Sequence, residues 1–196
     1  RIRSQRREIR GLQRDESRLS RLVEELGRVI AEEARRARPA AAMARRTDAV
    51  PAAPGSAVEQ SGALSFAALR GSLRLPIRGE LASRYGSARP GGGPTWKGLF
   101  IRSPAGQDVR AVASGRVVFA DWMRGFGNLL ILDHGDNYLT IYGNAEAVLK
   151  QVGDAVRSGE TVATTGASGG SEDSGLYFEV RHEGRPFDPL KWVGLN

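Results

Sequence analysis

The sequence predicts a mainly β domain, built as an antiparallel sheet and preceded by an α-helical coiled-coil tail. Apolar residues follow a seven-residue repeat over residues 2–30, and a stretch rich in alanine and proline comes next. The rest of the chain consists of short strand-like runs separated by Gly, Asp, Asn and Ser. We expect the C-terminal part of a coiled-coil helix over residues 1–37, a linker over 38–62 and the β domain over 63–196.

The helix prediction depends on two interleaved sets of apolar residues. One set is Ile2, Ile9, Val23 and Ile30, and the other is Leu12, Leu19 and Leu26, three residues further on. This is the a/d pattern of a coiled coil, broken at one a position by Glu16. The pattern is already in register at Ile2, which suggests that a longer coiled coil is cut upstream. The alternative is a lone amphipathic helix packed on the domain.

The excess positive charge of the chain lies in this helical segment. The net charge of +7 comes from 29 basic and 22 acidic residues, and residues 1–46 hold 14 arginines and 7 acidic residues. Because the remainder is balanced, a uniformly basic nucleic-acid-binding domain is disfavoured, and no nucleic acid is expected as a partner. The arginines form either a solvated face or a contact with an anionic surface. No run of 18 apolar residues occurs, so we expect a soluble protein, and the start without Met suggests a fragment or processed form.

The predicted linker reads "PAAAMARRTDAVPAAPGSAVEQSG" from Pro39. Its composition buries too little apolar surface to hold a fixed fold alone. Within it, Ala40 to Val50 has the composition of a helix of two or three turns, which is stable only when docked on something.

The β domain is expected to open with a short helix at Phe66 to Leu69. The strand-like runs that follow are "WKGLFIRS", "DVRAVASGRVVFADWM", "NLLILDHG", "NYLTIYGNA", "AVLKQV", "ETVATTGAS" and "GLYFEVRHEG". A hairpin turn is expected near residues 135–137. In the last run, alternation places Tyr177, Glu179 and Arg181 on one face of the strand.

Residues that carry common chemistry are scarce. The chain has no Cys, which excludes disulfides and thiolate metal sites, and only two His. We expect His134 to hydrogen-bond the hairpin turn and His182 to be an exposed residue at a strand end. Ser168 lies in a G-x-S-x-G match, but a loop and a strand follow it, whereas a nucleophile elbow needs a helix. The loop "SARPGGGPTWKG" is interpreted as a flexible surface loop.

The order of the blocks resembles a LytM-type domain, the M23 peptidase-like fold of the duplicated-hybrid-motif type. The blocks are "GELASRYG", "WKGLFIRSPAGQDVRAVASGRVVFADWMRGFGNLLILDHG", "LTIYGNA", "VGDAVRSGETVATTGASGG" and "LYFEVRHEGRPFDPLKWV". They cover residues 73–193. Active members of this family are zinc endopeptidases that cut peptidoglycan cross-links, with the motifs H-x-G-x-D, Y-x-H and H-x-H-F-E.

The resemblance also implies that this chain has lost its zinc site. The positions of the family's ligands and catalytic histidines fall here on Trp96, Phe100, Asn144, Gly175 and Tyr177. A phenol with a pKa near 10 is a poor zinc ligand at neutral pH. We therefore expect no metal, no cofactor and no catalytic residue.

In place of the zinc site, we expect an aromatic groove that binds a protein partner. Its predicted residues are Trp96, Lys97, Phe100, Phe126, Leu129, Tyr142, Asn144, Tyr177 and Arg181. For Trp96 and Phe100, simple core filling is the alternative. Phe126 and Leu129 are expected at the rim.

The combination of a coiled coil with a zinc-free domain resembles the degenerate LytM factors. This implies an activator of periplasmic zinc N-acetylmuramyl-L-alanine amidases of the AmiA/AmiB type at the division site of Gram-negative bacteria. The resemblance also implies that the upstream coiled coil answers to an FtsEX-type transporter complex, and that part of residues 1–60 holds the groove closed. The segment from Ala40 to Val50 is one candidate for this autoinhibitory plug. The competing interpretations are a passive peptidoglycan-binding module and an active metalloendopeptidase.

Overall fold

The computed structural model of the chain describes residues 1–47 and 65–194, which form one long helix and a β domain. The predicted linker beyond Thr47 therefore lies outside the described residues, as does most of the sequence that joins the helix to the domain. Neither the long helix nor any other described helix combines the length and apolarity needed to cross a membrane.

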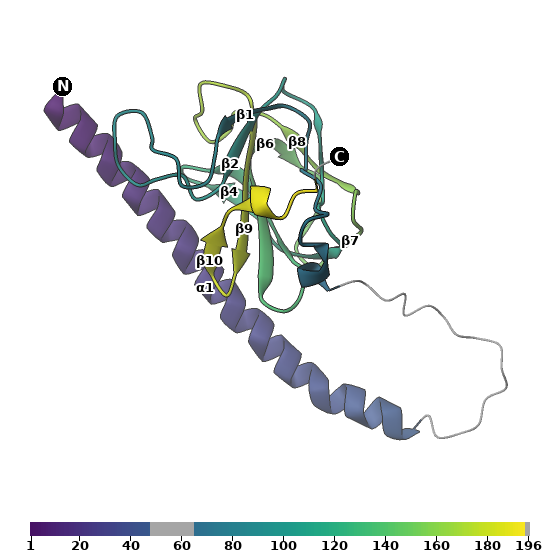
Figure 1. Cartoon of the computed structure of the whole chain (residues 1–196). Helices are drawn as coiled ribbons and strands as arrows, with labels where there is room; N and C mark the ends of the chain where they lie inside the picture. Colours follow the sequence, from purple (N-terminus) through teal and green to yellow (C-terminus); the bar gives the residue numbers. More distant parts are fainter. Residues whose placement is uncertain (48–64, 195–196) are drawn as a thin grey trace.

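The helix α1 spans Ile2–Thr47 and passes through Pro39 without ending (Figure 1). The predicted boundary at residue 37 is therefore wrong, because residues 38–47 continue the helix instead of beginning a linker. Proline removes one backbone hydrogen bond from a helix, but the alanines and arginines that follow Pro39 are strong helix formers. The predicted short helix at residues 40–50 is, up to Thr47, the end of α1.

The β domain contains ten strands in one antiparallel sheet system. Their bounds are β1 Glu80–Ser83, β2 Leu99–Arg102, β3 Asp108–Arg110, β4 Gly115–Met123, β5 Gly127–Asp133, β6 Tyr138–Val148, β7 Ala155–Val156, β8 Thr161–Thr165, β9 Gly175–His182 and β10 Arg185–Phe187. The main path runs β1-β2-β9-β6-β5-β4-β7, while β10 pairs with β9 and β8 pairs with both β6 and β3. Two short 3₁₀ helices, Phe66–Leu69 and Pro189–Lys191, lie near the ends of the domain. The predicted mainly β fold and its short first helix are confirmed.

Alternation along the central strands sends side chains to two apolar layers. On β9, Leu176, Phe178 and Val180 enter the main core of the domain, together with Tyr142 of β6 and Trp192 near the C-terminus. On the other face, Tyr177 of β9 joins a second cluster with residues from β2, β5 and β6. Successive side chains of a strand point to opposite faces, so both faces of this sheet carry apolar side chains and both must be covered by other elements.

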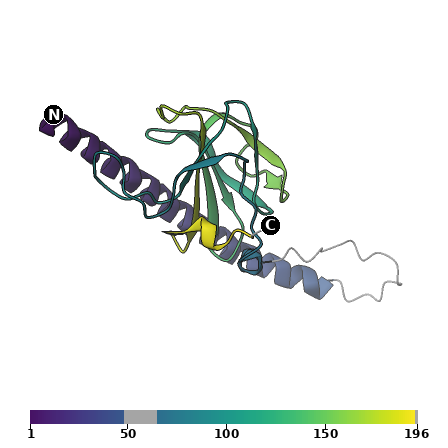
Figure 2. The ribbon, with the colours of Figure 1, turned by 45° about the horizontal axis from the view of Figure 1, so that its top comes forward.

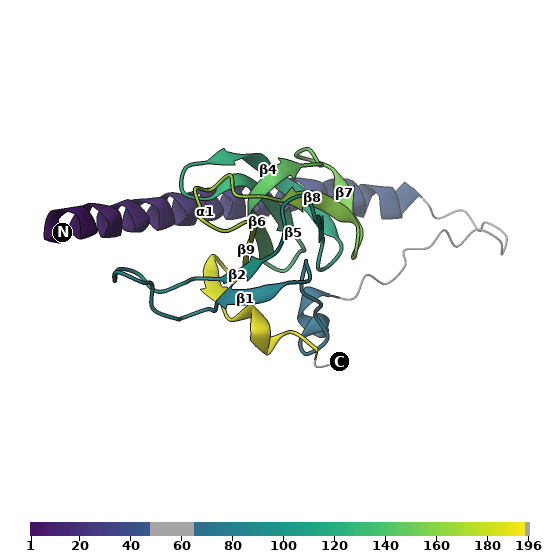
Figure 3. The same ribbon diagram turned by 90° about the horizontal axis from the view of Figure 1, so that it is seen from above.

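Helix α1 covers the second face. It crosses the sheet and projects beyond the domain at both ends (Figures 2 and 3). Leu19 and Val23 are 1% and 2% exposed, and Leu22, Leu26 and Ile30 pack against the same cluster. Among the described residues α1 is thus a single amphipathic helix packed on the domain. Whether it also pairs with another helix stays a prediction.

Both histidines contact other residues of the β domain. His134 lies between the carbonyl oxygen of Ser114, 2.8 Å from its Nδ1, and the hydroxyl of Thr140, 2.6 Å from its Nε2. Burial lowers the pKa of His134 below its ordinary value. His182 is half-buried and stacks on Tyr138 at 4.0 Å between ring centroids, so it is less exposed than expected. The predicted hairpin turn is confirmed by left-handed φ angles at residues 135–137, between β5 and β6.

Candidate functional site

The centre of the candidate site is the sheet face beneath α1, which we call the groove face. Its apolar members are Phe100, Phe126, Leu129, Ile131, Leu139, Ile141 and Tyr177. Tyr177 of β9 lies directly opposite Phe100 of β2 in the strand register, and opposite Gly143 of β6 on its other side. The ring of Phe126, from the turn before β5, lies 5.5 Å from the Tyr177 ring. Four segments distant in sequence thus build one aromatic surface.

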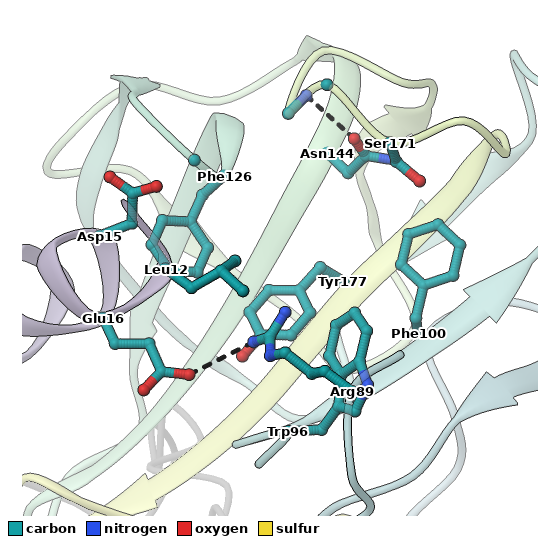
Figure 4. Close-up of a pocket in the computed structure, with 13 residues that line it drawn as sticks. Leu12, Asp15, Glu16, Arg89, Trp96, Phe100, Phe126, Asn144, Ser171 and Tyr177 are labelled. Carbon is teal, nitrogen blue, oxygen red and sulfur yellow. Dashed lines mark hydrogen bonds and ion pairs between the residues drawn. The ribbon is translucent and has the colours of Figure 1, made fainter. Parts of the chain in front are cut away.

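A small cavity remains between this surface and α1. Its volume is about 210 Å³, and it lies between Leu12, Asp15 and Glu16 of α1 and the side chains of Trp96, Phe100, Phe126, Asn144 and Tyr177 (Figure 4). The helix approaches the β4–β5 turn closely. A Cβ atom added to Gly125 would lie 2.6 Å from the carboxyl carbon of Asp15, and Gly125 also has a φ of 87°. A side chain at this position would require Asp15 to move, and the left-handed backbone would strain it as well.

An ion pair links α1 to the loop before β2. The Glu16 carboxylate accepts a hydrogen bond from Nη2 of Arg89 at 3.2 Å, and both side chains are largely buried, at 20% and 14% exposure. The Arg89 guanidinium also lies 4.0 Å above the Trp96 ring, and the Trp96 ring lies 6.2 Å from that of Tyr177 (Figure 4). Glu16, which breaks the heptad pattern, is thus matched by a cation in the loop before β2.

Arg89 was missed by the sequence reasoning, which interpreted its loop as flexible surface. The loop instead packs along α1, and an atom added at Gly93 would contact the side chain of Ile9. The signal in the sequence was the unmatched Glu16 in the apolar stripe, since a charge at a buried position needs a partner of opposite sign.

A second charged pair lies within the groove face. Arg181 is 2% exposed and donates from Nη2 to Oε1 of Glu179 at 3.2 Å, while Glu179 is fully buried. Arg181 also donates from Nη1 to the hydroxyl of Ser20 on α1 at 3.3 Å, and its Nε has no partner among the described residues. Burial raises the pKa of Glu179, and burial together with the nearby Glu179 raises the pKa of Tyr177 well above its ordinary value. Tyr177 therefore stays a neutral phenol.

Asn144 organises the loop that borders the cavity. Its side chain donates to the carbonyl oxygen of Gly166 at 2.8 Å and accepts from the backbone N–H of Gly169 at 2.9 Å. It is 3% exposed and has a φ of 63°, so the strand alternation of β6 is broken at this residue. Its side-chain amide therefore fixes the loop at residues 166–169.

Comparison with known proteins identifies the domain. Residues 94–189 match the sequence profile of Peptidase family M23. These residues form an M23 domain. The chain is 38% identical over 139 residues to the murein hydrolase activator EnvC of Escherichia coli K12, and 36% identical over 121 residues to the murein hydrolase activator NlpD of the same strain. These matches cover 71% and 61% of this chain but only 32% and 31% of the relatives, so the chain spans about a third of their length.

The fold of the M23 domain also matches solved structures. One of them is a zinc-containing peptidase from Vibrio cholerae, with a TM-score of 0.58 and 26% identity, over 62% of this chain and 40% of that one. The M23 fold implies a zinc ion at this face of the sheet.

The M23 domain of this chain does not fit zinc. Zinc sites in proteins use imidazole, thiolate or carboxylate ligands, and the five expected positions carry an indole, a phenyl ring, an amide, a hydrogen atom and a neutral phenol. At Gly175, an added Cβ would lie 2.2 Å from the carbonyl oxygen of Ile101, so β2 occupies the space of a side chain there. The described residues include no cluster of three or more His, Cys, Asp or Glu able to hold a metal ion.

The M23 domain places most of the predicted groove residues at the α1 contact, with three differences. The prediction that Tyr142 lines the groove is wrong. Tyr142 pairs with Phe178 in the strand register, so its side chain is fully buried in the main core, where its hydroxyl accepts from the backbone N–H of Val112. The prediction applied alternation through Asn144, where the φ angle breaks it. Leu129 is fully buried in the floor and not at the rim. Lys97 is half-buried but does not line the cavity.

Proposed function

We propose that this chain is a non-catalytic activator of peptidoglycan N-acetylmuramyl-L-alanine amidases, which binds a helix of the amidase on its groove face. The observation that carries the proposal is that an amphipathic helix, α1, already lies on this surface with Leu19 and Val23 almost fully buried. Similarity to two murein hydrolase activators supports an amidase-activation role. We further propose a periplasmic location in a Gram-negative bacterium, an amidase of the AmiA/AmiB type, and an FtsEX-type complex acting through an upstream coiled coil.

The activator would be autoinhibited in the closed arrangement. A partner helix and α1 cannot both bury side chains against Tyr177 and Phe100, so α1 must leave before the partner binds. The described α1 contacts with the groove-face cluster come from Leu19, Leu22, Val23, Leu26 and Ile30, which lie earlier in the chain than the plug predicted at residues 40–50. Binding of the amidase helix would then shift the amidase toward its open state through differential affinity.

The test is a reconstitution with a purified zinc amidase and dye-labelled sacculi. The full chain alone is expected to release no dye, and the chain lacking residues 1–60 is expected to stimulate the amidase more strongly than the full chain. In the truncated protein, Tyr177→Ala should reduce stimulation, while Arg124→Ala, in the β4–β5 turn outside the cavity, serves as a matched control. Equal stimulation by the full and truncated chains would remove autoinhibition.

Other outcomes of the same assay distinguish the competing functions. Dye release by the protein alone, with bound zinc, would favour an active peptidase. Sedimentation with sacculi and no effect on the amidase would favour a passive peptidoglycan-binding module. Arg181→Ala is a poor probe of partner binding, because it would leave Glu179 buried without its counter-ion and destabilise the domain by about 3–5 kcal/mol. Arg89→Ala is the better probe of charge recognition.

A further inference from the structure

The apolar stripe of α1 follows a heptad repeat, a period that packing on a fixed sheet face does not require. The stripe follows a seven-residue repeat from Ile2 to Ile30. A straight α-helix rotates such a repeat by about 20° per heptad, so only part of it can face a fixed surface. Accordingly, Leu19 and Val23 in the middle are buried, while Ile9 and Ile30 are half-buried and Ile2 is 67% exposed. A second helix that supercoils with α1 would use the whole stripe.

The heptad residues of the central part of α1 all lie on the side that faces the domain. Positions a and d from residue 9 to residue 30 are Ile9, Leu12, Glu16, Leu19, Val23, Leu26 and Ile30, and each of them is half-buried or buried on the domain. Pairing with another helix and covering the groove face are therefore mutually exclusive uses of one surface.

Glu16 sets a condition on the second helix. On the domain its carboxylate is neutralised by Arg89. In a parallel, in-register pair of identical helices, Glu16 would instead face a second Glu16, because a positions meet a positions. Two carboxylates at such a core position repel each other, so a second copy of this chain is disfavoured and a helix with a cation opposite Glu16 is favoured.

We propose that the α1 stripe is the docking surface for a second helix, which carries its own apolar heptad repeat and a Lys or Arg opposite Glu16, and that this pairing lifts α1 from the groove face. The proposal deepens the proposed function, since it rests on α1 being the cover of that site.

The contacts that hold α1 are of a kind that such a partner can replace. Two further links of α1 to the domain among the described residues are the ion pair of Arg116 with Glu33, in which both side chains are about half exposed, and the hydrogen bond of Arg181 with Ser20. Exposed ion pairs contribute little to stability, so burial of the apolar stripe supplies most of the hold. A second helix would bury the same stripe, so the exchange costs little free energy.

The test uses the full chain with one introduced cysteine as a reporter, since the natural sequence has none. Leu139→Cys places the thiol beneath α1, where the native side chain is 4% exposed, and Ser171→Cys at the cavity is a second, nearly isosteric reporter. The probe is a peptide with the sequence of residues 2–30 in which Glu16 is replaced by lysine, and the matched peptide keeps Glu16. Each is added at about 1 mM, the order of the effective concentration of a tethered segment.

The lysine peptide is expected to accelerate thiol modification about tenfold relative to the matched peptide, because it replaces like-charge repulsion by attraction. In a reporter chain that also carries Glu16→Lys, the preference should reverse toward the peptide that keeps Glu16. The control Glu25→Lys makes the same charge change at an exposed position of α1 and should leave the original preference.

Three results would overturn the proposal. If neither peptide accelerates modification at either reporter, α1 is a fixed cover. Equal acceleration by both peptides would refute the charge condition at Glu16. Acceleration that rises with the concentration of the chain alone would identify a second copy as the partner. No amidase is present in this assay, so its failure would leave amidase stimulation, and with it the proposed function, untouched.

Discussion

Leu19→Ala is expected to open the groove face without unfolding the β domain. Leu19 is 1% exposed and packs into the groove-face cluster, whereas the main core of the domain contains no residue of α1 among those described. Replacing a buried leucine by alanine costs about 2–5 kcal/mol. In the open state Leu19 contacts water, so this cost falls on the closed state alone.

The magnitude follows from the opening equilibrium. Because each 1.4 kcal/mol changes an equilibrium constant tenfold, a loss of about 2 kcal/mol raises the open population about 30-fold. Trypsin measures this population directly, since α1 is rich in arginine and proteolysis tracks the open form when opening is fast relative to cleavage. The cleavage rate between residues 14 and 28 should therefore rise about 30-fold.

The matched control is Val29→Ala, on the same helix but 46% exposed, which should leave the cleavage rate nearly unchanged. Thermal unfolding of the β domain should be similar in all three proteins. If Leu19→Ala instead lowers the unfolding temperature and leaves the cleavage rate at the native value, α1 and the domain unfold as one unit, and the interpretation of α1 as a removable cover is refuted.

Three further predictions concern the domain itself. Burial lowers the folded-state pKa of His134 below 6.5, so the unfolded chain binds a proton more readily than the folded chain. Stability should therefore fall as the pH drops below 6.5. The difference in melting temperature between pH 7.5 and pH 5 should be smaller in His134→Gln than in the native protein. Arg181→Met should lower the free energy of unfolding by about 3–5 kcal/mol, measured by urea denaturation, and a smaller loss when Glu179→Gln is added would identify the unpaired carboxylate as the cause. Gly175→His should not restore zinc binding, because its Cβ would meet the carbonyl oxygen of Ile101; a stoichiometric metal content would contradict this.

Strand alternation predicted the faces of the side chains correctly on β9 and incorrectly on β6. Alternation placed Tyr177 and Arg181 on one face and Phe178 on the other, and the structure agrees, because a regular strand has a period of two. The same rule failed on β6, where Asn144 has a left-handed φ that no alternation pattern reveals. Tyr142 was therefore assigned to the wrong face.

The sequence by itself determined the β domain and the amphipathic helix, since each depends on residue types and local periodicity. The resemblance to the LytM-type domain added the expectation that the zinc ligands are lost. Only the tertiary structure decided where the helix stripe is buried, that it runs past Pro39, and that Glu16 meets Arg89. These features depend on contacts between segments far apart in the chain. A heptad stripe fits another helix and an apolar sheet face equally well in sequence, and the choice between them is made by the shape and charge of the surface that meets it.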